Sequence, residues 1–311
     1  MSLAVVYSDK YLIDLAGLEK LHPYDTQKYR RIYQQLIKDG LLNEKNVFAP
    51  RPLDDDAILR VHTPEFLVSL KSPRMVAAFL EAPLMAALPA RIINRGLLMP
   101  FRYASAGTLL AARLALKRKI AVNLGGGFHH AHPHAGEGFC IYADIPIAVR
   151  SLQSEKLIQK TLIIDLDVHQ GNGTVLCLGP DKNTFTFSMH QGDIYPFPKP
   201  KSNIDIELQP GADDQTYLNL LAEQLPRLFE LAQPDMVFFQ AGCDTLAEDP
   251  LASLQMTESG LVQRDAMVID ASLQRQIPLV MTLGGGYSTN AWHAQYLSIR
   301  RTLQTYGPSP P

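Results

Sequence analysis

Two acidic residues and a histidine that could bind a metal ion stand close together in the segment Asp165-Leu166-Asp167-Val168-His169. Asp167 and His169 are two residues apart, so at the end of an extended strand their side chains leave the same face. An oxygen ligand from Asp244 would complete a set suited to Zn²⁺ or Fe²⁺ with one position open for water. This pattern favours a metal-dependent hydrolase. The alternative is that the carboxylates cap a loop and His169 is an ordinary surface histidine.

The pair His129-His130 follows three glycines, Gly125-Gly126-Gly127. Glycines allow left-handed dihedrals and close backbone approach, so a rigid turn could direct both histidines toward a metal-activated water. One of them would then act as a general base. They could instead be metal ligands or part of a histidine-rich loop, in which we expect His132 and His134 to be solvated.

A second glycine run, Gly284-Gly285-Gly286, precedes Tyr287. The tyrosine hydroxyl could donate a hydrogen bond to the oxyanion of a tetrahedral intermediate. Alternatively, Tyr287 is an aromatic residue after a flexible loop, without a chemical role. Neither glycine run has the Lys-Ser/Thr of a P-loop or the G-x-G-x-x-G spacing before a helix, so nucleotide binding is not expected.

An α/β sheet is expected to position these groups, because short β-rich runs alternate with helix-like stretches, as in a parallel sheet covered on both faces. Strands are predicted at residues 3–7, 120–124, 161–166, 184–189, 203–207, 236–241 and 279–283. Helices are predicted at residues 28–38, 64–71, 105–117, 145–153, 213–232 and 256–274. The polar clusters all follow carboxyl ends of predicted strands, where open α/β sheets place their active sites.

Composition limits the other possibilities. The chain has 311 residues, 46% of them hydrophobic, which is enough for one large α/β domain spanning 1–311. The proline-rich segment Pro196-Phe197-Pro198-Lys199-Pro200 is expected to be a stiff extended loop and not a linker between domains.

The net charge is -2 and like charges do not cluster, so no nucleic-acid or anionic-membrane surface is expected. No apolar stretch reaches the roughly 18 to 20 residues of a membrane span. Three widely spaced cysteines, Cys140, Cys177 and Cys243, fit a reducing compartment. We therefore expect a cytoplasmic protein, or also a nuclear one in a eukaryote.

Taken together, these motifs resemble the histone deacetylase family, which has the arginase/deacetylase fold. The resemblance is carried by Val6-Tyr7-Ser8, His22-Pro23, Val61-His62-Thr63, Gly127-Phe128-His129-His130-Ala131, Gly138-Phe139-Cys140, Asp165 to Gly173, Ala241-Gly242-Cys243-Asp244 and Gly285-Gly286-Tyr287. Segments 18–23, 125–130 and 169–173 are most similar to class IV, the deacetylase-11-like branch. The resemblance implies a single three-layer α/β domain with a mainly parallel central sheet flanked by helices.

The resemblance also implies roles for the site residues. A zinc ion would be held by Asp167, His169 and Asp244. His130 would be the principal general base and later the proton donor to the departing amine. His129 would act by charge and orientation, and Tyr287 would polarise the amide carbonyl.

Further residues receive supporting roles from the same resemblance. Asp165 would lie behind His129, and position 172 behind His130. A structural potassium ion is implied near Asp165, Asp167, His169, Ser188 and Met189. The tunnel for the acyl-lysine stem would be lined by Gly138, Phe139, Tyr195 and Leu251.

Position 172 departs from the family pattern. Asn172 stands where most zinc deacetylases have Asp, so the charge behind His130 is missing, which would lower the pKa of His130 and weaken activity on acetyl-lysine. No residue of the chain matches the acidic rim residue that grips the substrate backbone in many relatives. Class IV relatives favour long fatty-acyl chains, so the resemblance suggests acyl groups beyond acetyl.

The leading function is therefore removal of acetyl or longer fatty-acyl groups from lysine side chains of a protein or peptide. The alternative is hydrolysis of an acetylpolyamine or another small N-acyl amine, which would need an acidic mouth and usually a dimer-forming insertion. A two-manganese ureohydrolase like arginase would require further bridging carboxylates. A catalytically weak acyl-lysine binding module would have no use for both histidines and Tyr287. The sequence makes no prediction about the oligomeric state.

Overall fold

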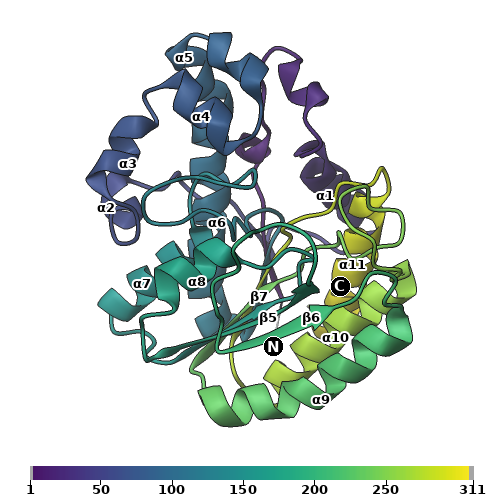
Figure 1. Ribbon diagram of the computed structural model, residues 1–311. Helices are drawn as coiled ribbons and strands as arrows, with labels where there is room; N and C mark the ends of the chain where they lie inside the picture. The colour runs from purple at the N-terminus through teal and green to yellow at the C-terminus, as the bar shows by residue number, and fades with distance from the viewer. Residues whose placement is uncertain (1–2, 308–311) are drawn as a thin grey trace.

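The computed structural model describes residues 3–307, which form a parallel sheet between two layers of helices (Figure 1). Within these residues the sheet has eight strands in the order β2-β1-β3-β8-β7-β4-β5-β6, and every neighbouring pair is parallel. The strands are β1 (Ala4–Val6), β2 (Val47–Phe48), β3 (Ile120–Asn123), β4 (Thr161–Asp165), β5 (Thr184–Gln191), β6 (Ile204–Leu208), β7 (Met236–Gln240) and β8 (Leu279–Thr282). The expected three-layer α/β domain is confirmed.

Helices connect most of the consecutive strands. The α-helices are α1 (Gln27–Lys38), α2 (Asp55–Ile58), α3 (Pro64–Ser69), α4 (Pro73–Phe79), α5 (Ala90–Ile93), α6 (Met99–Arg118), α7 (Asp144–Ser154), α8 (Asn172–Leu178), α9 (Asp214–Ala232), α10 (Glu258–Gln274) and α11 (Ala291–Tyr306). Short 3-10 helices are η1 (Asp9–Tyr11), η2 (Leu18–Leu21) and η3 (Pro83–Ala87), and η4 (Asn94–Leu98) is π-helical.

The central strands are apolar on both faces because both faces are covered. In β7, Val237 and Phe239 pack into one core cluster with helices α1, α9, α10 and α11. Met236 and Phe238 point the opposite way, into a second cluster with helices α6 and α7. Side chains alternate along a strand, so a continuous apolar run fills both cores at once. Figure 1 shows α9 and α10 along one side of the sheet and α7 and α8 along the other.

The predicted strands and helices are present, with ends that differ by a few residues. The main correction is α6, which begins at Met99 and not at residue 105, because it continues directly from η4. Helices α2, α4, α5, α8 and α11 were not predicted. The α8 segment Asn172-Gly173-Thr174-Val175 is poor in helix formers. Strand β2, with two residues, was too short to detect. Within segment 196–200, which was expected to be an extended loop, residues 196–198 form consecutive bends.

A row of polar residues crosses the sheet at the level where the strands end. The paired positions in this row are Asn123, Thr282, Gln240, Asp165 and Ser188, from β3, β8, β7, β4 and β5. All five are buried. Because adjacent parallel strands end at one edge, the loops that follow them converge above this row.

Within residues 3–307 no helix combines the length and the apolar character that crossing a membrane would require.

Candidate active site

The two carboxylates and the imidazole expected to bind metal converge above the polar row. One ligand atom from each of Asp167, His169 and Asp244 lies within 4.8 Å of the others, and all three residues are buried. His169 Nδ1 is 3.3 Å from Asp167 Oδ1 and 3.3 Å from Asp244 Oδ2. Glycines make this convergence possible, since a Cβ at Gly285 would lie 2.1 Å from Asp244 Oδ2 and one at Gly242 2.1 Å from Asp167 Oδ2.

The charges of this cluster fit a divalent cation. Burial and the neighbouring charge of Asp167 raise the pKa of Asp244 to about 7. Two buried carboxylates at this spacing repel each other unless a positive charge lies between them. The donor set of two carboxylates and one imidazole suits Zn²⁺ and leaves room for further ligands. The three residues could therefore hold such an ion.

Both histidines of the glycine-rich turn have the hydrogen-bond partners expected for them. His129 Nδ1 donates to Asp165 Oδ2 at 2.9 Å, and His130 Nδ1 donates to Asn172 Oδ1 at 2.7 Å. Burial opposes a charge on His129, but the carboxylates of Asp165 and Asp167 outweigh it and raise the pKa of His129 to about 9. Burial and the charge of His129 instead lower the pKa of His130 well below its usual value. The neighbouring carboxylates thus favour the charged form of His129, and burial favours the neutral form of His130.

A cavity of about 260 Å³ leads to this cluster. It is lined by Glu81, His130, Gly138, Phe139, His169, Ile194, Tyr195, Leu251 and Tyr287. The four residues expected to form the tunnel therefore line the same cavity as His169, a metal-ligand candidate, and two of the three catalytic candidates, His130 and Tyr287. Gly138 is packed so closely on His130 that a Cβ there would lie 2.5 Å from the imidazole Cδ2. A side chain at position 138 would displace the base.

The structure adds one residue to the surroundings of the site and corrects one expectation. Glu81, for which the sequence offered no motif, lines the cavity and supplies an acidic group at its mouth. His132, expected to be solvated, is half-buried, with its Nε2 3.7 Å from Glu137 Oε2. His134 is exposed, as expected.

The residues of the implied potassium site lie at the ends of the neighbouring strands β4 and β5 and in the loop after β4. Asp165 is paired with Ser188 across β4 and β5, and Met189 is the next residue of β5. The Ser188 hydroxyl bonds with His190 Nδ1 at 2.9 Å.

Four buried polar residues that no motif indicated brace the active-site loops. Asp144 accepts hydrogen bonds from the N–H groups of Gly127 and Phe128, at 2.8 and 2.7 Å. Lys28 donates to the carbonyl oxygen of Gly284 at 2.9 Å. The other two are Gln240, which donates to the Gly127 carbonyl, and Arg264, which donates to the Gly242 carbonyl.

These contacts join segments far apart in the sequence. Lys28 and Gly284 are 256 residues apart, so neither local spacing nor periodicity could have indicated the pair. The one available sign was a Lys or Arg at a position that the helix pattern assigns to the buried face. Such residues are rarely buried without a partner, so each indicates a hydrogen-bond acceptor nearby.

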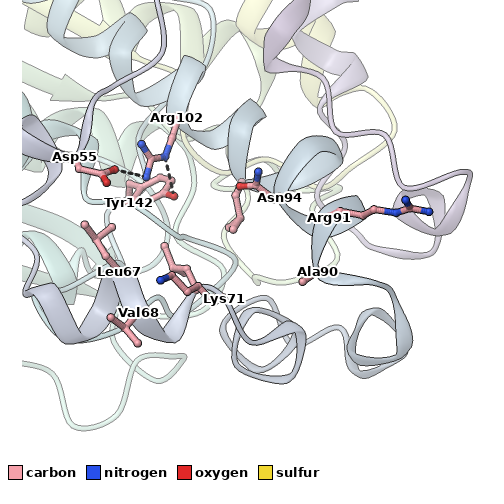
Figure 2. A pocket seen from close by; sticks show the side chains of 11 residues that line it. Asp55, Leu67, Val68, Lys71, Ala90, Arg91, Asn94, Arg102 and Tyr142 are labelled. Carbon is pink, nitrogen blue, oxygen red and sulfur yellow. Dashed lines mark hydrogen bonds and ion pairs between the residues drawn. The ribbon is translucent and has the colours of Figure 1, made fainter.

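A separate open cavity of about 480 Å³ lies among α2, α3, α5 and α6 (Figure 2). There the Arg102 guanidinium pairs with Asp55 at 2.6 Å and donates to the Tyr142 hydroxyl at 3.4 Å. Figure 2 shows Arg91 extending away from these groups. This cavity shares no lining residue with the 260 Å³ cavity. We assign it no role in the chemistry.

Known proteins resemble the chain along nearly its whole length. A family model described as the histone deacetylase domain matches residues 22–303. The chain is 38% identical over 288 residues to histone deacetylase 2 of Arabidopsis thaliana, covering 92% of this chain and 74% of that protein. It is 27% identical over 320 residues to the acetoin utilization protein AcuC of Staphylococcus aureus, covering 95% of this chain and 81% of that protein.

Solved structures show the same fold. The crystal structure of the HDA15 HD domain matches with a TM-score of 0.79 at 20% sequence identity, over 97% of this chain and 90% of that chain. The family model covers most of the residues that build the sheet and all those that build the cluster above it. The chain therefore belongs to the histone deacetylase family of amide hydrolases.

Proposed function

We propose that the chain is a zinc-dependent hydrolase that removes acetyl or longer fatty-acyl groups from lysine side chains. The observation that carries this proposal is the 260 Å³ cavity, in which Phe139, Tyr195 and Leu251 form walls above His130 and Tyr287. Aromatic and aliphatic walls suit an unbranched apolar stem, and the polar groups lie at one place along it. An amide at the end of such a stem would meet the base and the hydroxyl together.

A bound zinc ion would polarise the amide carbonyl and make a water molecule easier to deprotonate. His130 has its Nδ1 proton engaged by Asn172, so its Nε2 is free to accept a proton from that water. The same nitrogen then donates the proton to the departing amine. His129, hydrogen-bonded to Asp165, would orient the site and, when protonated, add positive charge beside it.

Tyr287 supplies a proton donor on the other side of the reacting carbonyl. Burial and the charge of Asp244 raise the pKa of the Tyr287 hydroxyl, so it keeps its proton at neutral pH. Its backbone N–H donates to Asp249 at 2.7 Å, which fixes the residue after the glycine run. A neutral hydroxyl held there can donate to the oxyanion as charge develops.

A second, much smaller cavity lies next to the histidine turn. It has a volume of about 10 Å³, its lining includes the aromatic residues Tyr24, Tyr29, Phe101 and Phe128, and it shares no lining residue with the 260 Å³ cavity. That volume is about enough for one water molecule. Acetyl-lysine and longer acyl-lysine substrates therefore belong in the same assay.

Glu81 keeps open the alternative of a small N-acyl amine. It is an exposed carboxylate at the mouth of the cavity, and an acidic mouth would attract a second ammonium group on an acetylpolyamine. A peptide backbone N–H could also donate to it. Substrates of both kinds therefore belong in the same assay.

Three further assignments are also proposals. A structural potassium ion would lie near Asp165, Ser188 and Met189, with Asp167 and His169 close by. Class IV is supported by the sequence motifs around His22, His130 and Asn172. The scarcity and spacing of the cysteines support a cytoplasmic protein.

The proposed function is tested with purified protein, an acetyl-lysine peptide and an acetylpolyamine. We expect acetyl-lysine hydrolysis that is lost after chelation and restored by Zn²⁺, with Fe²⁺ compared in parallel. Asp167→Asn should reduce both metal content and turnover, since it removes one ligand charge at nearly constant shape. Hydrolysis that persists in metal-free protein would refute the mechanism. A polyamine turned over far faster than the peptide, with loss of that preference in Glu81→Gln, would establish the alternative.

A further inference from the structure

Glu137 lies at the start of a tight turn that carries a wall of the cavity. Its N–H donates to the Cys140 carbonyl at 3.0 Å, and the Cys140 N–H donates back at 2.8 Å. The two residues between them, Gly138 and Phe139, have positive φ values of 50° and 66°. Two such residues closed by a pair of hydrogen bonds resemble the two-residue type I′ turn. The backbone of Glu137 is thereby fixed relative to Phe139.

The carboxylate of Glu137 has two different partners, one for each oxygen. Oε1 accepts a hydrogen bond from the Tyr195 hydroxyl at 2.6 Å, and Oε2 accepts one from Asn172 Nδ2 at 3.3 Å. His132 Nε2 is the other titratable neighbour, at 3.7 Å from Oε2. One partner is thus a wall of the cavity, and the other is the residue behind the general base.

The hydrogen bonds continue to His130, and an aromatic contact between His130 and Tyr195 closes the ring. Asn172 Oδ1 accepts from His130 Nδ1 at 2.7 Å. The rings of His130 and Tyr195 are in edge contact, with centroids 4.9 Å apart. The ring therefore consists of the base His130, the amide of Asn172, the carboxylate of Glu137 and the phenol of Tyr195. Glu137 is its charged member.

The direction of these bonds gives Asn172 a definite role. Its amide donates through Nδ2 to a carboxylate and accepts through Oδ1 from an imidazole. Donation to a negative group polarises an amide and makes its oxygen a better acceptor, because hydrogen bonds in a chain strengthen one another. The negative charge that an Asp at position 172 would supply comes instead from Glu137, which is linked to His130 through Asn172.

We propose that Glu137 is a positioning residue for hydrolysis: through Asn172 it orients and polarises His130, and through Tyr195 it holds the wall of the acyl-lysine tunnel. This inference rests on the proposed function, in which His130 is the base and the cavity takes the substrate. It explains how a member of this family with Asn at position 172 retains an anionic partner for the base. It also links the base to the part of the cavity that the substrate stem contacts.

Glu137→Gln tests the charge. The amide can keep both contacts, since its oxygen can accept from Asn172 Nδ2 and its amino group can donate to the Tyr195 hydroxyl oxygen, but the negative charge is lost. We expect kcat for the acetyl-lysine peptide to fall about threefold to tenfold, the order expected for replacing a charge-assisted hydrogen bond by a neutral one. Glu223→Gln, the same change on the exposed side of α9, is the matched control. Thermal unfolding checks that each variant is folded.

The double variant Glu137→Gln with Asn172→Asp separates positioning from a loss of structure. It moves the carboxylate next to His130, and the amide introduced at position 137 can donate to it while accepting from Tyr195. Every hydrogen bond and the single charge are kept, so we expect kcat to return to within about twofold of the original protein. Asn172→Asp alone places two carboxylates side by side, and we expect its kcat to be below that of the double variant.

A spectroscopic measurement keeps the inference independent of activity. In zinc-loaded protein with ¹⁵N-labelled histidine, the His130 Nδ1 resonance should shift in Glu137→Gln and return toward its original position in the double variant. A protein that hydrolyses no acyl-lysine substrate would refute the proposed function, and this resonance would then decide the inference alone. Unchanged kcat and resonance in Glu137→Gln, or a double variant no better than Glu137→Gln, would overturn it.

Discussion

Asp144 offers a sharp test of how the fold positions the two histidines. Its buried carboxylate accepts the N–H groups of Gly127 and Phe128 and the hydroxyl of Thr108. Phe128 is followed directly by His129 and His130, so these bonds fix the backbone from which both imidazoles extend. Asp144→Asn keeps the shape of the side chain but replaces one acceptor oxygen by an amino group. In either orientation of the amide, that amino group faces a backbone N–H group, that of Gly127 or that of Phe128, which cannot accept a hydrogen bond.

The magnitude follows from counting these bonds. At least one hydrogen bond to a charged acceptor is lost, which costs about 1.5–3 kcal/mol. Burial raises the pKa of Asp144, so neutralising the side chain recovers part of this cost. We expect a net loss of about 1–3 kcal/mol in unfolding free energy. Turnover should fall further, by about tenfold to a hundredfold, because a displacement of about 1 Å in a catalytic group has effects of this size.

Denaturant unfolding and steady-state kinetics measure the two effects separately. Asp56→Asn, on the exposed first turn of α2, is the matched control for the change of charge. Thr108→Val removes only the hydroxyl and leaves both N–H bonds in place, so its effect on turnover should be smaller. An Asp144→Asn variant that unfolds and turns over like the original protein would refute the reasoning, since it would show that the turn holds its shape without the carboxylate.

Three other predictions concern the hydroxyl, the glycine cradle and pH. Tyr287→Phe should retain zinc and lower kcat by about a hundredfold or more; unchanged kinetics would remove the hydroxyl from the mechanism. Gly285→Ala should lower the zinc content measured by elemental analysis, because its Cβ would lie 2.1 Å from Asp244 Oδ2; full zinc occupancy would contradict this. Burial lowers the pKa of His62 to about 4. Between about pH 6.5 and 4 the unfolded chain therefore binds the extra proton, and stability falls by up to about 3 kcal/mol as pH falls. This part of the pH dependence should be absent from His62→Asn, and parallel curves would refute it.

The sequence predicted the groups that lie at strand ends, and it did so for a physical reason. Asp167, His169 and Asp244 follow buried apolar strands, and parallel strands bring their carboxyl ends to one edge. Knowing the strands was therefore enough to bring the ligands together. Family resemblance then supplied the tunnel residues, which the strand pattern alone could not indicate.

The supporting residues could not be predicted in the same way. Lys28 lies in α1 and contacts the carbonyl of Gly284 after β8, a pairing that depends on how a helix packs on the opposite end of the chain. Glu137 sits in a short turn without periodicity, and its two partners are the first residue of α8, Asn172, and Tyr195 in the loop after β5. Such contacts depend on tertiary packing, which spacing along the chain does not encode.

Position 172 shows why a single substitution in a motif cannot be interpreted alone. Considered by itself, Asn172 removes a charge from behind the base and suggests a weaker enzyme for acetyl-lysine. The carboxylate of Glu137 changes that interpretation. It accepts a hydrogen bond from the Asn172 amide and polarises it, and the oxygen of the same amide accepts from His130. The rate on acetyl-lysine should therefore follow the charge at Glu137.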